Sequence, residues 1–143
     1  MYVLGELDAT VTAFANEDQE TYRSIQKIAG LPAGFSGKNT AAEIAIHPSG
    51  EFLYTSNRGD DSIAEFNIDK STGHLTLIGH ASTLGEEPRN FAIDPTGKYL
   101  LIANQHTGTI VEYAIDSVTG KLSRAREIAK VPAPVCLIFV PMD

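Results

Sequence analysis

Two arginines and two glutamates have the residue types and the spacing to bind an anion and to activate a water molecule. Glu6 and Arg58 occupy matching places in two similar stretches, and Glu43 and Arg89 stand near the starts of two further similar stretches. Arginine presents a planar fork of N–H donors that suits a carboxylate, a phosphate or a developing oxyanion. A carboxylate beside it can act as general base on water. The alternative is a set of structural salt bridges between repeats, and the spacing leaves both interpretations open.

The elements that must position these side chains come from an internal repeat. The stretch AEIAIHPSGEFLYTSNRGDDSIAEFNIDKSTGHL at residues 42–75 recurs without a gap 47 positions later, so that Pro48 matches Pro95 and Asn57 matches Asn104. A period of this length, built from short alternating runs and glycine turns without a helical stripe, is typical of propeller blades. The residues 2–14 also match residues 54–66, at an offset of 52. We therefore expect the chain to open halfway through a blade.

The fold class predicted from this repeat is all-β, a portion of a β-propeller with about three four-stranded antiparallel blades. We expect one partial propeller domain over residues 1–143, with blades at about 1–40 (incomplete), 41–87 and 88–130 and a closing strand within 131–143. The predicted strands lie near residues 2–6, 10–16, 22–29, 42–47, 52–56, 62–68, 74–81, 90–94, 99–103, 109–115, 121–129 and 135–140.

Strand reversal predicts which side chains share one end of the blades. In an up-and-down blade, the loop between strands two and three lies at the same end as the link to the next blade. This end should hold Glu6, Glu43, Arg58, Arg89, Asn90 and Gln105. The turns HPSG and DPTG belong to the opposite end, so His47 and Asp94 are interpreted as turn residues. The other histidines show no spacing that would make them metal ligands.

Composition excludes several classes of function. Eleven basic against eighteen acidic side chains give a net charge of −7, which argues against nucleic acid or an anionic membrane as partner. No apolar run is long enough for a membrane span and no leader is visible, so a cytoplasmic location is expected. The single cysteine, Cys136, lies between Val135 and Leu137 and is expected to be a buried thiol.

Several separate motifs resemble the lactonase family of seven-bladed β-propellers. They are VLGELDATVTAF, NTAAEIAIHPSGEFLYTSNRGDDSIAEF, EPRNFAIDPTGKYLLIANQ and VPAPVC, in the order of that family's last three blades. The family includes 6-phosphogluconolactonases and carboxymuconate-lactonizing cycloisomerases. The resemblance implies Glu6 and Arg58 as catalytic residues and Arg89, Asn90 and Glu43 as substrate-binding residues. Gly5 departs from the family pattern, which usually has asparagine there, and other cleft residues of the family would precede Met1.

The resemblance implies a lactone hydrolase that acts on a sugar lactone or sugar phosphate, needs no cofactor or metal, and belongs to carbohydrate metabolism through the pentose phosphate pathway. A muconate-type cycloisomerase and a non-catalytic ligand-binding propeller fragment are the alternatives. Because three blades cannot close a ring, we expect self-association or N-terminal blades supplied by a longer chain. The apolar residues expected to lie uncovered are Ile44, Phe91 and Leu137.

Overall fold

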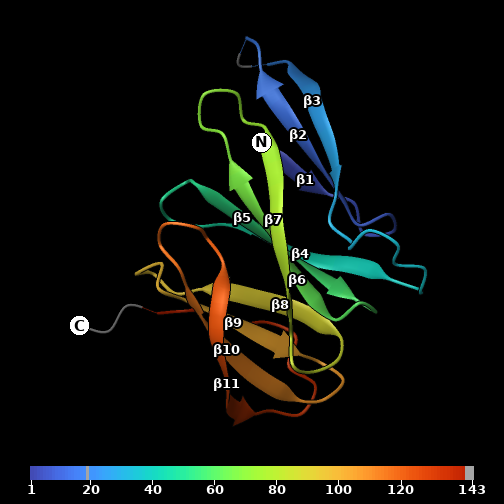
Figure 1. Cartoon of the computed structure of the whole chain (residues 1–143), viewed down its shortest axis with the longest axis vertical. Coiled ribbons are helices and arrows are strands. Elements are labelled where there is room, and N and C mark those ends of the chain that lie inside the picture. The colour runs from blue at the N-terminus through green and yellow to red at the C-terminus, as the bar shows by residue number, and fades with distance from the viewer. Residues whose placement is uncertain (19, 141–143) are drawn as a thin grey trace.

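The computed structural model describes residues 1–18 and 20–140, which form three antiparallel sheets and no helix (Figure 1). This confirms the all-β propeller fold class, and no helix of the described chain could cross a membrane. The sheets are ordered β1-β2-β3, β4-β5-β6-β7 and β11-β10-β9-β8, so each follows one repeat of the sequence. The strands are β1 Tyr2–Leu4, β2 Thr10–Asn16, β3 Tyr22–Ala29, β4 Thr40–Ile46, β5 Phe52–Arg58, β6 Ser62–Ile68, β7 Leu75–Ser82, β8 Pro88–Ile93, β9 Tyr99–Asn104, β10 Thr109–Ile115 and β11 Leu122–Lys130.

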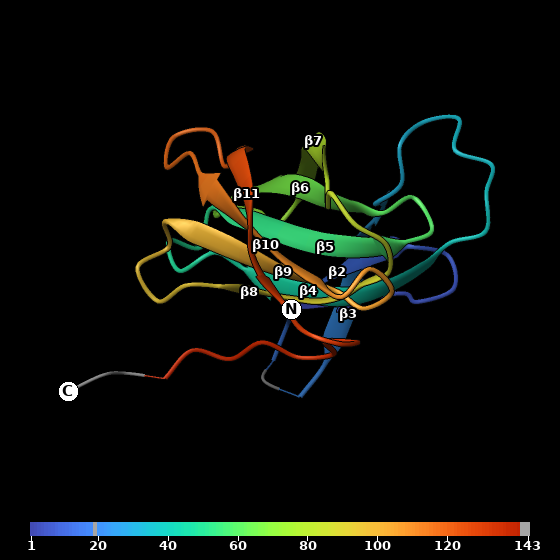
Figure 2. The ribbon, with the colours of Figure 1, turned by 90° about the horizontal axis from the view of Figure 1, so that it is seen from below.

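Strand register places the two ends of the blades as the sequence predicts. Thr40 pairs with Arg58 where β4 begins, and Ile46 pairs with Leu53 where β4 ends. The turn that contains His47 therefore lies at the opposite end of the sheet from Arg58. In Figure 2 the loops gather at the two ends of the stacked sheets, and the strands run between them.

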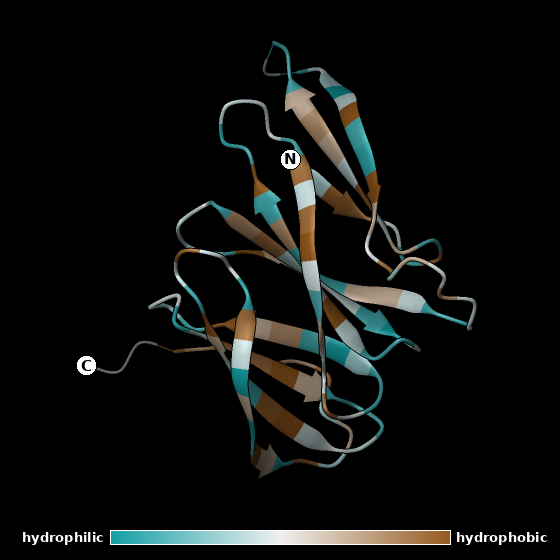
Figure 3. Cartoon of the chain, viewed as in Figure 1, coloured by the Kyte–Doolittle hydropathy of each residue, from teal (hydrophilic) through white to brown (hydrophobic). Residues whose placement is uncertain are grey.

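The hydrophobic core lies between the faces of neighbouring sheets. One cluster joins the second and third sheets around Tyr54, Phe91 and Ile102, and the other joins the first and second sheets around Val11 and Phe66. Strand β5 is buried on both faces because its sheet is the middle one, and its sequence is accordingly apolar on both sides of the pleat at FLY. Figure 3 shows the brown hydrophobic bands on these central strands. Burying each large apolar side chain contributes about 1.5–3 kcal/mol.

Asparagines at one repeated position connect each blade to the chain that enters it. Asn57 donates from Nδ2 to the carbonyl oxygen of Gly30 at 2.9 Å, and Asn104 donates to that of Thr83 at 2.9 Å. Both side chains are fully buried. A carbonyl left without a donor in such a place would cost free energy, so this pair of bonds fixes where each link between blades runs.

Tyrosines at a second repeated position connect neighbouring sheets near the opposite end. Tyr2 donates its hydroxyl to the carbonyl of Gly73 at 2.9 Å, and Tyr54 donates to that of Gly120 at 2.7 Å. Both glycines have positive φ, 76° and 72°, in the tight turns that present these carbonyls. We call the asparagine and tyrosine contacts of Asn57, Asn104, Tyr2 and Tyr54 the blade staples.

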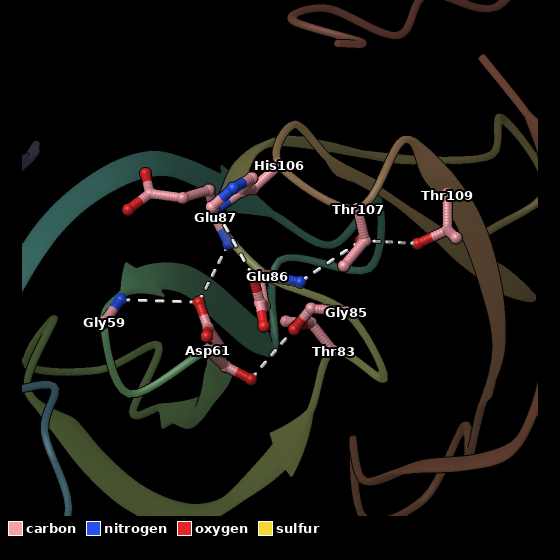
Figure 4. Close-up of polar contacts among 9 residues, drawn as sticks. All are labelled: Gly59, Asp61, Thr83, Gly85, Glu86, Glu87, His106, Thr107 and Thr109. Carbon is pink, nitrogen blue, oxygen red and sulfur yellow. Dashed lines mark hydrogen bonds and ion pairs between the residues drawn. The ribbon is translucent and has the colours of Figure 1, made fainter. Parts of the chain in front are cut away.

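The link from the second to the third sheet is organised by Asp61. Figure 4 shows its carboxylate between the backbone N–H of Gly59 and that of Glu87, at 3.4 and 2.9 Å from Oδ1. Its own carbonyl accepts the N–H of Thr83 at 2.9 Å. Asp61 and Glu87 both have positive φ, near 51° and 58°, a conformation that side chains rarely adopt. The link is therefore held by bonds made to the loop between β5 and β6 of the preceding blade.

Three expectations were wrong. Residues 135–140 form no strand, because in the described chain the segment is held by one bond, from the Leu137 N–H to a side chain, and a strand needs a backbone ladder. Cys136 is exposed rather than buried, since this segment lies on the surface. Phe91 is 2% exposed because the second and third sheets pack over it, and Ile44 and Leu137 are half-buried.

Candidate functional site

All five residues predicted for the site line a single cavity of about 290 Å³ at the end of the blades where β5 ends. The residues come from three sheets and from the segment after β11. Gln105 does not belong to this cavity and lies beside Glu87, His106 and Ala133 instead. The polar residues of the cavity are Glu6, Glu43, Arg58, Arg89 and Asn90, and Val135 forms part of the wall.

Arg58 and Glu6 form an ion pair between the second and first blades. The Arg58 Nη2 atom lies 2.7 Å from Glu6 Oε1 and also donates to the Ala41 carbonyl at 3.2 Å. The arginine side chain is 13% exposed and that of the glutamate 64%, so the cation is held in place while the carboxylate is largely in solvent. The Arg58 Nε atom is buried and has no hydrogen-bond partner among the described residues. One donor of the guanidinium is therefore unused within the described chain, while the residue as a whole lines the cavity.

The backbone conformation after Arg58 explains why the next residue is a glycine, Gly59. Arg58 is the last residue of β5, and Gly59 follows with a φ of 123°. A Cβ atom at Gly59 would lie 2.1 Å from the carbonyl oxygen of Lys38, which no side chain can accept. The loop between β5 and β6 therefore lies against the long connection before β4. This close approach fixes the place from which the arginine enters the cavity.

Glu43 is positioned by a bulge in β4. The register of β4 against β5 shifts between Ala41 and Ile44, and the N–H of Glu43 donates to Ser56 Oγ at 3.0 Å instead of to a strand partner. The Glu43 carboxylate accepts the N–H of Ile44 at 3.1 Å through Oε1 and the Asn90 side chain through Oε2. Bulges commonly redirect a side chain at a functional site, and this one holds a carboxylate at the cavity wall.

Arg89 differs from Arg58 because it is exposed and its side chain has no hydrogen-bond or ion-pair partner among the described residues. It precedes Asn90 on β8, at the mouth of the same cavity. An unpaired guanidinium beside a buried, paired one suits recognition of an anionic group. Two cations and two carboxylates thus share the site.

The opposite end of the blades holds His47 and Asp94, as predicted. His47 is 9% exposed, and its Nε2 atom lies 2.8 Å from the Gly97 carbonyl in the corresponding turn of the next blade. Its Nδ1 atom lies 2.8 Å from Ser49 Oγ. Each ring nitrogen therefore has a partner within the turns, and across residues 1–18 and 20–140 no three His, Cys, Asp or Glu side chains are placed to hold a metal ion.

The sequence interpretation missed Val135 and Ser56. Val135 was assigned to a strand, although it forms a cavity wall in a segment without strand structure. The signal that could have found this wall is the repeat itself, since adding 47 to Asn90 gives Leu137, which lies beside the same site. Ser56 carries no such signal, because only the bulge in β4 brings its hydroxyl to the Glu43 backbone.

This chain belongs to the family of lactonases built as seven-bladed β-propellers, since the family described as "Lactonase, 7-bladed beta-propeller" matches residues 1–139. A 6-phosphogluconolactonase of Bacillus subtilis is 36% identical over 140 residues, covering 97% of this chain and 40% of the relative. A 6-phosphogluconolactonase of Xenorhabdus nematophila is 40% identical over 91 residues, covering 64% and 27%. These relatives confirm the resemblance seen in the motifs.

Solved structures agree with this assignment. The structure of a periplasmic gluconolactonase of Pseudomonas aeruginosa superimposes with a TM-score of 0.91 at 32% identity, covering 99% of this chain and 42% of that one. A protein of Lactobacillus plantarum superimposes with a TM-score of 0.89 at 36% identity, covering 94% and 40%. The chain thus spans less than half the length of each of these proteins.

Proposed function

We propose that the cavity containing Arg58, Arg89 and Glu6 is part of a site that hydrolyses a sugar lactone carrying a phosphate, such as 6-phosphogluconolactone. The observation that carries the proposal is the convergence of a held cation, a free cation and a solvated carboxylate on one cavity. Membership of the lactonase family and the 6-phosphogluconolactonase relatives support it.

The chemistry divides among these three side chains. Water attacks the lactone carbonyl carbon as the Glu6 carboxylate accepts a proton from it, and the carbonyl oxygen becomes an oxyanion. The guanidinium of Arg58, which lines the cavity, is the donor for this oxyanion. A preorganised donor of this kind contributes about 3–4 kcal/mol to lowering the barrier. The ring C–O bond then breaks, the leaving alkoxide takes the proton, and the product is a hydroxy acid.

Arg89 takes the anionic group of the substrate in this proposal. Its exposure and lack of a partner within the described chain leave all its N–H donors available to a phosphate or carboxylate. Arginine holds such groups by two parallel bonds, so Arg89 orients the lactone while Arg58 acts on its carbonyl. The product gains a carboxylate, and the same pair of cations accommodates it until release.

The experiment that tests the proposal measures lactone hydrolysis above the spontaneous rate with 6-phosphogluconolactone. Glu6→Gln is expected to lower kcat by about 100-fold, the usual contribution of a general base. Arg58→Ala is expected to lower it by about 100-fold to 1000-fold, as for loss of one oxyanion donor. Arg89→Ala is expected to raise KM more than it lowers kcat, because it removes binding of a group remote from the reacting carbon.

Two control variants separate catalysis from stabilisation. The double variant Glu6→Arg with Arg58→Glu keeps an ion pair between the blades but exchanges the positions of the two charges. If it stays active, the pair has only a structural role and the proposed catalytic roles are wrong. Lys70→Ala removes the exposed ion pair of Lys70 with Glu51, 3.0 Å apart at the opposite end of the blades, and should leave the rate unchanged. Binding of the lactone without turnover by the unmodified protein would overturn the hydrolase and support a ligand-binding propeller.

A further inference from the structure

Two residues of the cavity wall, Glu43 and Asn90, are joined to Leu137 by a chain of hydrogen bonds. The N–H of Leu137 donates to Asn90 Oδ1 at 2.7 Å, and Asn90 Nδ2 donates to Glu43 Oε2. Each residue lies 47 positions from the next, so all three occupy the same place in successive repeats. The chain of bonds therefore crosses from the C-terminal segment to the third blade and on to the second.

The orientation of the Asn90 amide is determined by its two partners. Leu137 offers only an N–H and the Glu43 carboxylate offers only acceptors, so the oxygen must face Leu137 and the nitrogen must face Glu43. One N–H of the amide is left for any ligand. Both ends of this side chain thus have partners within the protein, and the substrate-binding role that the family resemblance implied for Asn90 would use the remaining N–H.

Glu43 is held firmly as a consequence. One carboxylate oxygen accepts the Asn90 amide, the other accepts the N–H of Ile44, and the Glu43 backbone is fixed by Ser56. The neighbouring residue in the sequence of β8, Arg89, lines the same cavity and has no ion-pair partner in the described chain. A carboxylate free to rotate in this cavity would be attracted to that unpaired guanidinium.

We propose that Asn90 is a positioning residue that holds the Glu43 carboxylate away from Arg89, and thereby keeps Arg89 free to bind the anionic group of a substrate. This inference rests on the proposed function for the identity of the anion. It also explains why a cavity that contains two carboxylates leaves one of its two arginines unpaired. Because the Leu137 N–H bonds to Asn90, the position of the C-terminal segment also helps to fix the orientation of the Asn90 amide.

The test removes the amide and then removes the carboxylate that it restrains. In Asn90→Leu, Glu43 is expected to pair with Arg89, and binding of 6-phosphogluconate measured by calorimetry should weaken about tenfold, the consequence of about 1.4 kcal/mol lost at the site. In the double variant Asn90→Leu with Glu43→Gln the competing charge is gone, so the affinity should return to near the original value. A merely structural role for Asn90 predicts no such rescue.

A second measurement needs no ligand. Hydrogen exchange of the Arg89 Nε–H, followed by NMR, should slow at least about fivefold in Asn90→Leu because the new ion pair protects it, and should be fast again in the double variant. The Leu137 amide should exchange faster in both variants, since its acceptor is lost. Asn90→Asp keeps an acceptor for Leu137 and repels Glu43, so it supplies the same test if the leucine variant fails to fold. Gln105→Leu, at the rim but outside the cavity, is the control and should change neither signal.

The outcomes separate the two proposals. Unchanged Arg89 exchange in both Asn90→Leu and Asn90→Asp overturns the positioning role, and so does a double variant that binds as weakly as Asn90→Leu. If the unmodified protein binds no 6-phosphogluconate, the anion-binding part of the proposed function fails, while slowed Arg89 exchange in Asn90→Leu still supports the role of Asn90.

Discussion

The blade staples and the residues that line the cavity differ in how they use the internal repeat. The staples keep the same residue in two successive repeats, asparagine at positions 57 and 104 and tyrosine at positions 2 and 54, and each bonds a different position in its neighbour. The remaining repeat has Gly5 in place of the asparagine and Leu101 in place of the tyrosine. At the cavity, equivalent positions bond each other, as in Glu6 with Arg58 and Glu43 with Asn90. There the residue type changes from one repeat to the next.

The difference has a simple physical reason. A contact between two equivalent positions needs a donor and an acceptor, or two opposite charges, and two copies of one charged residue supply neither. Charged residues at equivalent positions that meet at the cavity must therefore differ, whereas positions that meet an unlike partner can stay the same. In this chain, the exchange of one charged residue for a complementary one at equivalent positions, as from Glu6 to Arg58, occurs at the cavity.

The largest expected effect comes from breaking the staples. Asn57→Ala and Asn104→Ala should each lower the free energy of unfolding by about 2–3 kcal/mol, because each leaves a buried carbonyl without its hydrogen-bond donor and creates a void. Both side chains are fully buried, so the two losses should be similar. Urea denaturation followed by circular dichroism measures them.

The control for the staples is Asn67→Ala on β6, where the side chain is exposed and the change should stay within about 0.5 kcal/mol. If only one of the two buried asparagines proved costly, the repeats would not be using this position alike and the comparison would break.

A smaller effect is expected when two equivalent positions at the cavity are given the same charged residue. Glu6→Arg places two guanidiniums together where an ion pair stands now, and should lower the free energy of unfolding by about 1 kcal/mol at low salt. Because Glu6 is 64% exposed, salt should screen the repulsion and most of the loss should vanish in 1 M NaCl. A loss that does not depend on salt would mean that the two positions need not be complementary in charge.

The third prediction concerns Glu65, whose Oε1 accepts the N–H of Leu122 in the next blade at 2.8 Å. Burial raises the pKa of this carboxyl above its ordinary value of 4.5. The native state therefore binds more protons than the unfolded chain above pH 4.5, and stability falls as pH rises through the window between the two pKa values. Glu65→Gln keeps the acceptor without the charge, so it should stabilise the protein, by a margin that grows with pH from about 4.5 and then levels off.

A glutamine already makes the equivalent contact elsewhere in the chain, because Gln26 on β3 accepts the N–H of Leu75, which is equivalent to Leu122, at 2.7 Å. Thermal unfolding of both proteins between pH 4 and 8 makes the measurement. A variant less stable than the original at pH 8 would show that the carboxylate charge itself supports this contact.

The smallest effect belongs to the turns at the end opposite the cavity, where Asp69 and its equivalent Asp116 repeat faithfully and bond within their own turns. The hydrogen bonds from Ser71 lower the pKa of Asp69 to about 2. The unfolded chain therefore binds more protons between about pH 4 and 2, and the stability due to Asp69 is lost as pH falls through that window. Asp69→Asn should flatten this part of the acid unfolding curve, and a curve of unchanged slope would contradict the assignment.

Much of the fold could be predicted because it depends on local pattern. Alternating runs and turn residues predicted eleven of the strands to within a few residues, since strand and turn preferences act over short distances. The twelfth, at residues 135–140, could not be judged in this way, because its pattern favours a strand while only a neighbouring backbone edge can make one.

What the sequence by itself determined was the repeat, and with it the blades, their two ends and the set of residues gathered at one of them. Only the tertiary structure decided how these residues pair. Glu6 forms an ion pair with Arg58, Asn90 donates a hydrogen bond to Glu43, and the side chain of Arg89 has no partner in the described chain. The reason is that pairing depends on distances between atoms of different sheets. Those distances follow from a bulge in β4, the close approach at Gly59 and the packing of three sheets, and none of these is a property of residue type or spacing along the chain.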